Sequence, residues 1–173
     1  INLYAMNGAK YWIHVVCLFI IQLTILDNIQ LHSYVYINIY ILAILVLPYG
    51  MKKLTVLFLA FLFGLIVDLA NNTMGIHAAA TTFLAYIRPR LLQLTFNREP
   101  VDEMEGTHKM RNLGWFLKYT SFSVLAYNVV LILAEAFTFA NINITFMRIL
   151  CSSIVSYVFI LLYYFIAIKK KQE

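Results

Sequence analysis

Charged residues are scarce in this chain, which has 8 acidic and 13 basic residues, so that only 12% of its 173 residues carry a charge. Soluble domains contain roughly 25% charged and about 45–50% apolar residues, whereas 62% of this chain is hydrophobic. A soluble core would not bury that much apolar surface. The composition therefore argues against a soluble globular domain and predicts an integral membrane protein.

Cysteine pairs and catalytic motifs are also lacking. Cys17 and Cys151 lie inside apolar stretches, without CxxC or Cys/His spacing, and we expect both to be buried free thiols. The chain has no GxSxG, HExxH or Gly-rich phosphate loop. The sequence thus predicts a protein that is not an enzyme and that needs no cofactor.

Long apolar runs make up most of the chain. At about 20 residues per crossing they predict an all-α polytopic membrane protein with about six transmembrane helices in a single domain, residues 1–173. No signal-peptide cleavage site follows the first run, so we expect that helix to remain in the mature protein. Pro89 is expected to kink or end the fourth span. The expected spans are residues 11–29, 34–47, 54–69, 76–92, 113–137 and 144–168.

The second span is short and rich in Tyr, Ile and Val, which favour β-strands. A β-hairpin is therefore an alternative over residues 34–47. Within hydrocarbon, however, every backbone N–H and C=O needs a partner, which an isolated hairpin does not supply. We therefore expect a helix there.

The basic residues predict the orientation of the chain, because Lys and Arg accumulate in cytoplasmic segments. With six spans, nearly all of them fall on one side, and only Arg148 lies near the other. We predict that both termini are cytoplasmic, with a main cytoplasmic loop at about 95–112 and short outer turns near 28–33, 70–75 and 139–144. The net charge of +5 then reflects orientation and not nucleic-acid binding.

Ionisable residues inside spans cost roughly 2.5–3.5 kcal/mol each at a helix centre, so each requires an explanation. Asp68 and His77 flank one outer turn, and Glu135 and Arg148 flank another, so each pair should share a depth. Asp27 lies near the same face. This cluster either connects helices within the bundle or contacts a partner or ligand. No ligand spacing supports a metal site built from its members.

Small residues gather at the start of the fourth span. Gly75, Ala78 and Ala79 lie there, and Gly64 lies in the third span. Small side chains let transmembrane helices approach closely. We predict that these four residues form a helix-packing contact and that the fourth span is the central packing helix.

Three stretches combine polar and small residues in a specific order: Phe63-Gly64-Leu65-Ile66-Val67-Asp68, Asn72-Thr73-Met74-Gly75-Ile76-His77-Ala78-Ala79-Ala80 and Ala85-Tyr86-Ile87-Arg88-Pro89. These stretches and the order of the elements resemble MreD, the integral membrane component of the bacterial rod shape-determining system, in its Bacteroidetes form. The likeness covers nearly the whole chain, with further matches at 22–31, 114–119, 135–139 and 148–150. The Tyr127-Asn128 pair departs from it, because similar sequences would have histidine there.

The resemblance implies a non-catalytic member of the elongation complex in the bacterial inner membrane. Such a protein binds MreC and works with MreB, RodA and a class B penicillin-binding protein to direct lateral peptidoglycan synthesis and cell shape. It also implies a fold similar to the substrate-binding components of energy-coupling-factor transporters. A vitamin-binding transporter subunit is therefore the alternative, although polar residues within the spans are sparse for such a pocket. An intramembrane enzyme acting on lipid-linked wall precursors would need catalytic groups at one depth, and only the outer cluster meets that condition.

Overall fold

The structure is a computed structural model that describes residues 8–26, 35–48, 50–95, 113–136 and 142–168. Most of these residues are helical, and none of them lies in a β-strand. In chain order the elements are α1 (Gly8–Ile21), the π-helix η2 (Gln22–Leu26), α2 (Ile41–Leu45), α3 (Lys53–Asn71), α4 (Ile76–Thr95), α5 (Leu113–Ala136) and α6 (Ile142–Ile168).

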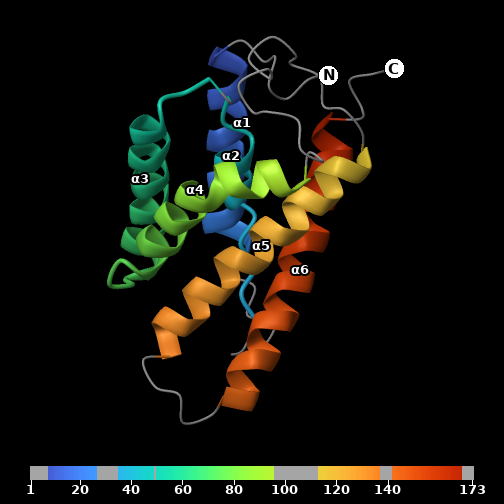
Figure 1. Cartoon of the computed structure of the whole chain (residues 1–173). Coiled ribbons are helices and arrows are strands. Elements are labelled where there is room, and N and C mark those ends of the chain that lie inside the picture. Colours follow the sequence, from blue (N-terminus) through green and yellow to red (C-terminus); the bar gives the residue numbers. More distant parts are fainter. Residues whose placement is uncertain (1–7, 27–34, 49, 96–112, 137–141, 169–173) are drawn as a thin grey trace.

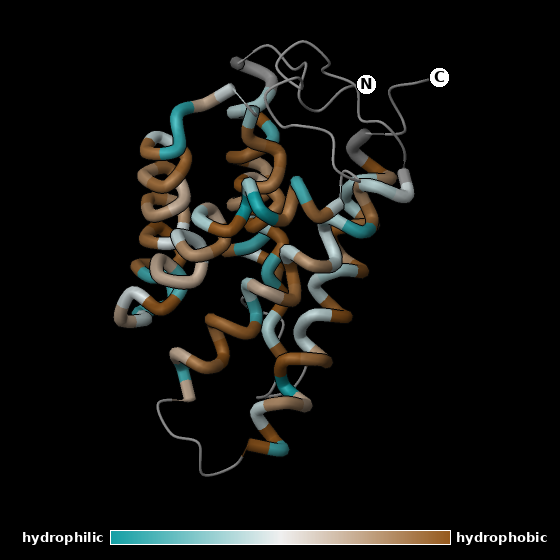
Figure 2. The backbone as a smooth tube through the Cα atoms, in the orientation of Figure 1, coloured by the Kyte–Doolittle hydropathy of each residue, from teal (hydrophilic) through white to brown (hydrophobic). Residues whose placement is uncertain are grey.

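Three of the described helices are long and apolar enough to cross a membrane: Lys53–Asn71, Gly114–Ala136 and Ile142–Ile166. Only 28% of the apolar window of the last one is buried, which leaves Ile154, Val158 and Leu162 exposed on its surface. Figure 2 shows that α3 is apolar over most of its length and hydrophilic toward its ends. Exposed apolar surface of this extent suits lipid and not water. The described chain is therefore that of an α-helical membrane protein.

Four of the six predicted helices lie close to their expected ranges, as α3, α4, α5 and α6. The first predicted span corresponds to α1 and η2, which together cover residues 8–26. Pro89 does not end α4, because the helix continues to Thr95. The described helices that meet the length and hydropathy needed for crossing number three, fewer than the six expected.

The prediction of a helix over residues 34–47 is wrong. Residues 35–39 are not helical, and the helix that follows them, α2, is only 5 residues long. We call residues 35–47 the central segment. It runs through the middle of the bundle (Figure 1), and α2 contacts α1, α3, α4 and α5. Every residue from Ile37 to Leu47 is at most 5% exposed.

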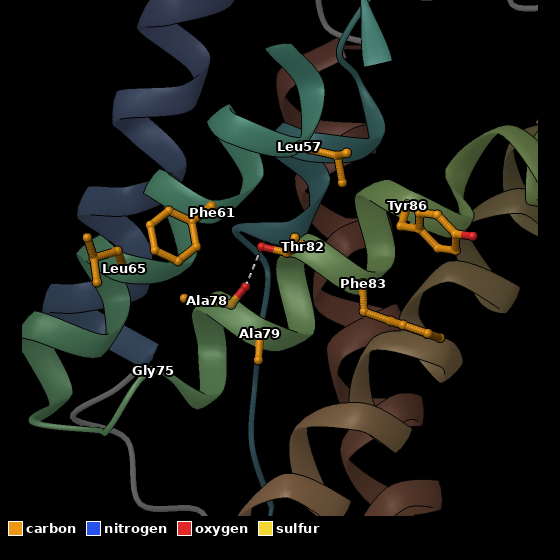
Figure 3. A pocket seen from close by; sticks show the side chains of 9 residues that line it. All are labelled: Leu57, Phe61, Leu65, Gly75, Ala78, Ala79, Thr82, Phe83 and Tyr86. Carbon is orange, nitrogen blue, oxygen red and sulfur yellow. Dashed lines mark hydrogen bonds between the residues drawn. The ribbon is translucent and has the colours of Figure 1, made fainter. Parts of the chain in front are cut away.

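The helices α3 and α4 pack closely at Gly64. A Cβ on this glycine would lie 2.4 Å from the Ala78 Cα and 2.3 Å from the Thr81 Oγ1, so only glycine permits the contact. Gly75 has a different role, because its φ of +83° is a left-handed conformation, and a Cβ at this position would meet no atom within 4 Å. Ala79 is exposed and lines an outer groove between the two helices (Figure 3).

Candidate functional site

The central segment carries buried main-chain groups that lie outside regular secondary structure, and side chains of neighbouring helices bind them. The Gln22 Nε2 donates to the carbonyl of Ile37 at 2.8 Å, and its Oε1 accepts from the N–H of Ile39 at 2.9 Å. Gln22 is only 1% exposed. Its amide therefore replaces the neighbouring strand that an extended backbone would otherwise require.

Two serines one turn apart on α6 bind the same stretch of backbone from another helix. The N–H of Tyr36 donates to the Ser152 Oγ at 3.1 Å, and the N–H of Asn38 donates to the Ser156 Oγ at 3.0 Å. The Ser156 hydroxyl also donates to the carbonyl of Tyr36 at 3.2 Å. Non-helical backbone is tolerated at membrane depth where protein satisfies it in this way.

The end of α2 is bound by a buried cation. Arg88, which is 4% exposed, donates through Nη2 to the carbonyls of Leu45, at 3.5 Å, and of Leu47. The hydroxyl of Tyr11 donates to the carbonyl of Ala43 at 2.9 Å. A positive charge at the C-terminal end of a helix complements the helix dipole and the unpaired carbonyls there. Arg88 therefore anchors the central segment to α4.

The side chains of Tyr36, Asn38 and Tyr40, at every second position of the segment, all contact residues of α5, so they share one side of it. The Tyr40 hydroxyl lies 2.5 Å from the Tyr127 hydroxyl and 3.2 Å from the His77 Nδ1. The His77 Nδ1 lies 2.9 Å from the Tyr127 hydroxyl, which closes a buried triangle of three polar groups.

Tyr127 belongs to α5, and the next residue of that helix, Asn128, contacts the same side of the segment. The Nδ2 of Asn38 donates to the Oδ1 of Asn128 at 3.4 Å, and both residues are nearly inaccessible. The Nδ2 of Asn128 donates in turn to the carbonyl of Val124 at 3.1 Å. Tyr127 and Asn128, the pair that departs from the MreD-like pattern, are therefore α5 residues that contact the central segment.

Asp68 caps the start of α4 from the preceding helix. Its Oδ1 accepts from the N–H of His77 at 3.0 Å, and its Oδ2 accepts from the N–H of Ala78 at 2.8 Å. The hydroxyl of Thr73 also donates to Oδ1. The first N–H groups of a helix have no partner within the helix, and a carboxylate there also complements the helix dipole. Asp68, at 2% exposed, thus joins α3 to α4.

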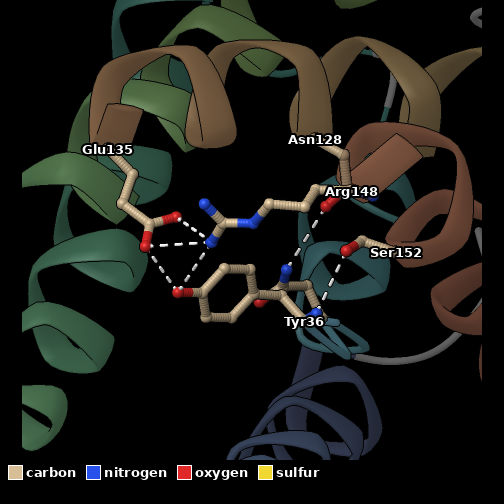
Figure 4. A network of polar contacts seen from close by, with 6 residues as sticks. Tyr36, Asn128, Glu135, Arg148 and Ser152 are labelled. Atoms are coloured by element: carbon tan, nitrogen blue, oxygen red, sulfur yellow. Dashed lines mark hydrogen bonds and ion pairs between the residues drawn. The ribbon is translucent and has the colours of Figure 1, made fainter. Parts of the chain in front are cut away.

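Glu135 and Arg148 form an ion pair between α5 and α6, as expected from their matched depths. The Arg148 Nη2 lies 2.9 Å from the Glu135 Oε2 and 3.1 Å from the Oε1. Tyr36 completes this group (Figure 4): its hydroxyl donates to the Glu135 Oε1 at 2.6 Å, and its ring lies 5.5 Å from the Arg148 guanidinium carbon. The side chains of Arg148 and Glu135 are 16% and 33% exposed, so the group reaches the surface.

The five polar residues predicted as one cluster do not form one in the described chain. Asp68 and His77 lie together at the start of α4, whereas Glu135 and Arg148 lie together at the end of the α5–α6 pair. The central segment lies between them, with Tyr40 at His77 and Tyr36 at Glu135. Asp27 lies outside the described residues.

The two cysteines are free, as expected, but the prediction that they are buried is wrong. Cys17 and Cys151 are both exposed on the surface of the bundle. Among the described residues, no group of three or more His, Cys, Asp or Glu side chains could hold a metal ion.

Sequence reasoning missed the residues that hold the central segment, which are Gln22, Tyr36, Asn38, Tyr40, Ser152 and Ser156. One local signal was present. Polar residues at 36, 38 and 40 alternate with Ile37 and Ile39, and this period of two indicates extended backbone. The serines and Gln22 carry no such signal, because nothing in the apolar helices around them marks these polar residues as partners of the central segment.

The arrangement as a whole fixes a buried, non-helical segment within a helical bundle. Comparison with family models, with curated proteins and with solved structures found no match to this chain.

Proposed function

We propose that this chain is a non-catalytic component of a bacterial elongation complex, of the MreD kind, which acts in the inner membrane by binding MreC. In this proposal MreB, RodA and a class B penicillin-binding protein are the further members of the complex. The protein then supplies a rigid membrane scaffold and not a reaction centre.

The interlocking of the motif residues is the observation that carries this proposal. Gly64 admits Ala78, Asp68 caps the helix that contains Ala78, and His77 binds Tyr40 in the central segment. Gly75 supplies the left-handed turn that starts α4. These residues contact one another in the structure, so their spacing in the sequence serves one structural contact. A match at such residues supports a family resemblance more than a match at apolar residues would.

The proposal includes six crossings of the membrane with both termini in the cytoplasm. The central segment would be the second crossing, in non-helical and short helical form, because side chains from η2, α4 and α6 bind its backbone. α1 with η2, α3, α4, α5 and α6 would be the other five. The start of α1, the start of α3 and the end of α6 lie toward the same end of the bundle in Figure 1, which is consistent with this path.

A surface that a partner could contact exists at Tyr36, Glu135 and Arg148, where the ion pair is partly exposed. Residues 37–47, which are nearly inaccessible, fill the middle of the bundle, where a small-molecule pocket between helices would otherwise lie. This filling favours the scaffold over the transporter alternative.

Copurification tests the proposal. The tagged full chain would be extracted in a mild detergent, next to an unrelated tagged membrane protein of similar size as the control. We expect a stoichiometric partner with one transmembrane helix and a periplasmic coiled coil, and depletion of the chain should make rod-shaped cells round. A bound small molecule without such a partner, or turnover of a lipid-linked wall precursor by the purified protein, would contradict the proposal.

A further inference from the structure

A groove of about 560 Å³ lies on the outer surface between α3 and α4 (Figure 3). Leu57, Phe61 and Leu65, spaced four residues apart, form the wall from α3. Small-molecule sites in proteins have volumes of about 300–1,000 Å³, so the groove is large enough for a ligand.

The α4 side of the groove has small side chains along its floor and large aromatic side chains along its rim. Ala79 and Thr82 form the floor, because their side chains are small, and Phe83 and Tyr86 rise beside them. The Thr82 hydroxyl donates to the carbonyl of Ala78 at 2.7 Å, so it presents its methyl side to the groove without an unmet polar group. The lining therefore suits an apolar chain.

Both walls of the groove continue into a cation at the same end. Lys53 lies one turn before Leu57 on α3, and Arg90 lies one turn after Tyr86 on α4. Residues four apart share a helix face. The Arg90 guanidinium carbon lies 6.0 Å from the centre of the Tyr86 ring, so this cation lies over the rim of the groove. Lys53 and Arg90 are both exposed.

The carboxylates of the described chain are bound elsewhere. Asp68 binds the first N–H groups of α4, and Glu135 binds Arg148. Neither therefore offers a partner for the two cations. An apolar groove whose two walls each continue into a positive charge is complementary to an amphipathic anion.

We propose that the groove binds an anionic phospholipid, with an acyl chain along α3 and α4 and the headgroup phosphate at Lys53 and Arg90. Membrane lipids supply such anions at the interface, where each Lys or Arg adds about 1 kcal/mol of attraction. A partner helix would fill the same groove but would not require both cations. This lipid site does not depend on the elongation complex.

Native mass spectrometry of the full chain tests the charge requirement. Phosphatidylglycerol and phosphatidylcholine with identical acyl chains would be added to the detergent-purified protein. We expect preferential retention of phosphatidylglycerol and a loss of at least about fivefold in the Lys53→Ala, Arg90→Ala double variant. Lys118→Ala removes an exposed cation on α5 and should change nothing. Equal retention of the two lipids, or equal loss in the Lys118 variant, would overturn the proposal.

Filling the groove tests its location. Ala79→Phe should abolish phosphatidylglycerol retention, whereas Ala70→Phe, at an exposed position of α3 outside the groove, should preserve it. Both positions are exposed, so both variants should fold, which size-exclusion elution checks. A photoreactive phenylalanine at Phe83 should crosslink to phospholipid in cells. Retained lipid in the Ala79 variant, or a polypeptide as the crosslinked product, would show that the groove is not a lipid site.

Discussion

Individual polar side chains in this protein replace the regular backbone partners of a buried segment. Gln22 shows this most clearly, because its one amide binds both an N–H and a C=O of the central segment. Such an exchange leaves the buried backbone satisfied without a helix. It also means that the loss of one side chain leaves two buried main-chain groups without a hydrogen-bond partner.

Gln22→Leu should therefore destabilise the protein strongly. An unsatisfied buried polar group costs about 1–3 kcal/mol, and this change leaves two of them while keeping the side-chain size similar. Thermal unfolding in detergent measures the effect as a lower Tm. Gln93→Leu is the matched control, since Gln93 is exposed on α4 and should shift stability by less than about 0.5 kcal/mol. Equal Tm values for the two variants would show that the Gln22 contacts contribute little.

The ion pair between Glu135 and Arg148 makes a second prediction at this scale. Glu135→Arg and Arg148→Glu alone should each lower the yield of folded protein, because each places two like charges in a poorly hydrated site. Removing one partner of a buried pair costs about 3–5 kcal/mol, and we expect roughly 1–3 kcal/mol here because Glu135 is 33% exposed. The exchanged double mutant should recover much of the loss, as measured by fluorescence-detected size exclusion.

The partner-binding role of this pair predicts a different pattern. If either residue contacts a periplasmic partner, the single mutants should fold but should no longer copurify with that partner. Additive losses in the double mutant, without recovery of folding or of binding, would show that the residues do not act as a pair.

At the scale of elements, the contact between α3 and α4 depends on Gly64, because a glycine has no side chain to hold the helices apart. Gly64→Ala places a Cβ against the Ala78 backbone, so the helices must separate, and overpacking of this kind costs about 1–3 kcal/mol. Gly114→Ala is the control, since no atom lies within 4 Å of its added Cβ and alanine favours a helix by about 1 kcal/mol. Tm should fall for the first and hold or rise for the second. A rise in both would disprove the close contact.

The helices themselves could be predicted from the sequence because their signals are local. Long apolar runs ended by polar breaks gave α3, α5 and α6 to within a few residues. The expected contact between Glu135 and Arg148 is present because equal distances from one turn place residues at equal depth in antiparallel helices. Asp68 and His77 were likewise placed on either side of their turn.

The central segment could not be predicted in the same way. Its partners include Gln22, Arg88 and Ser156, which are distant in sequence, and no local sequence pattern predicts these contacts. A helix was expected on the assumption that the segment must satisfy its own backbone. Side chains from other helices bind the buried backbone instead. Buried N–H and C=O groups therefore do have partners, but a helix is not needed to supply them.

At the scale of the whole molecule, the proposed bundle is one in which the chain crosses the membrane once without a long helix. Such a crossing accounts for one of the three proposed crossings that no described long apolar helix provides, and α1 with η2 and α4 would make the other two. It also explains why the inner side of α4 is polar, since Arg88 and His77 face the central segment.

Cysteine labelling on each side of the central segment tests this crossing most directly. In a Cys17→Ser, Cys151→Ser background, Ser33→Cys and Thr73→Cys should react with a membrane-impermeant thiol reagent in intact spheroplasts. Lys52→Cys, Asp102→Cys and Lys170→Cys should react only after lysis. Reaction of the residue 33 and residue 52 cysteines under the same condition would mean that residues 35–47 do not cross the membrane, and the proposal of six crossings would then be wrong.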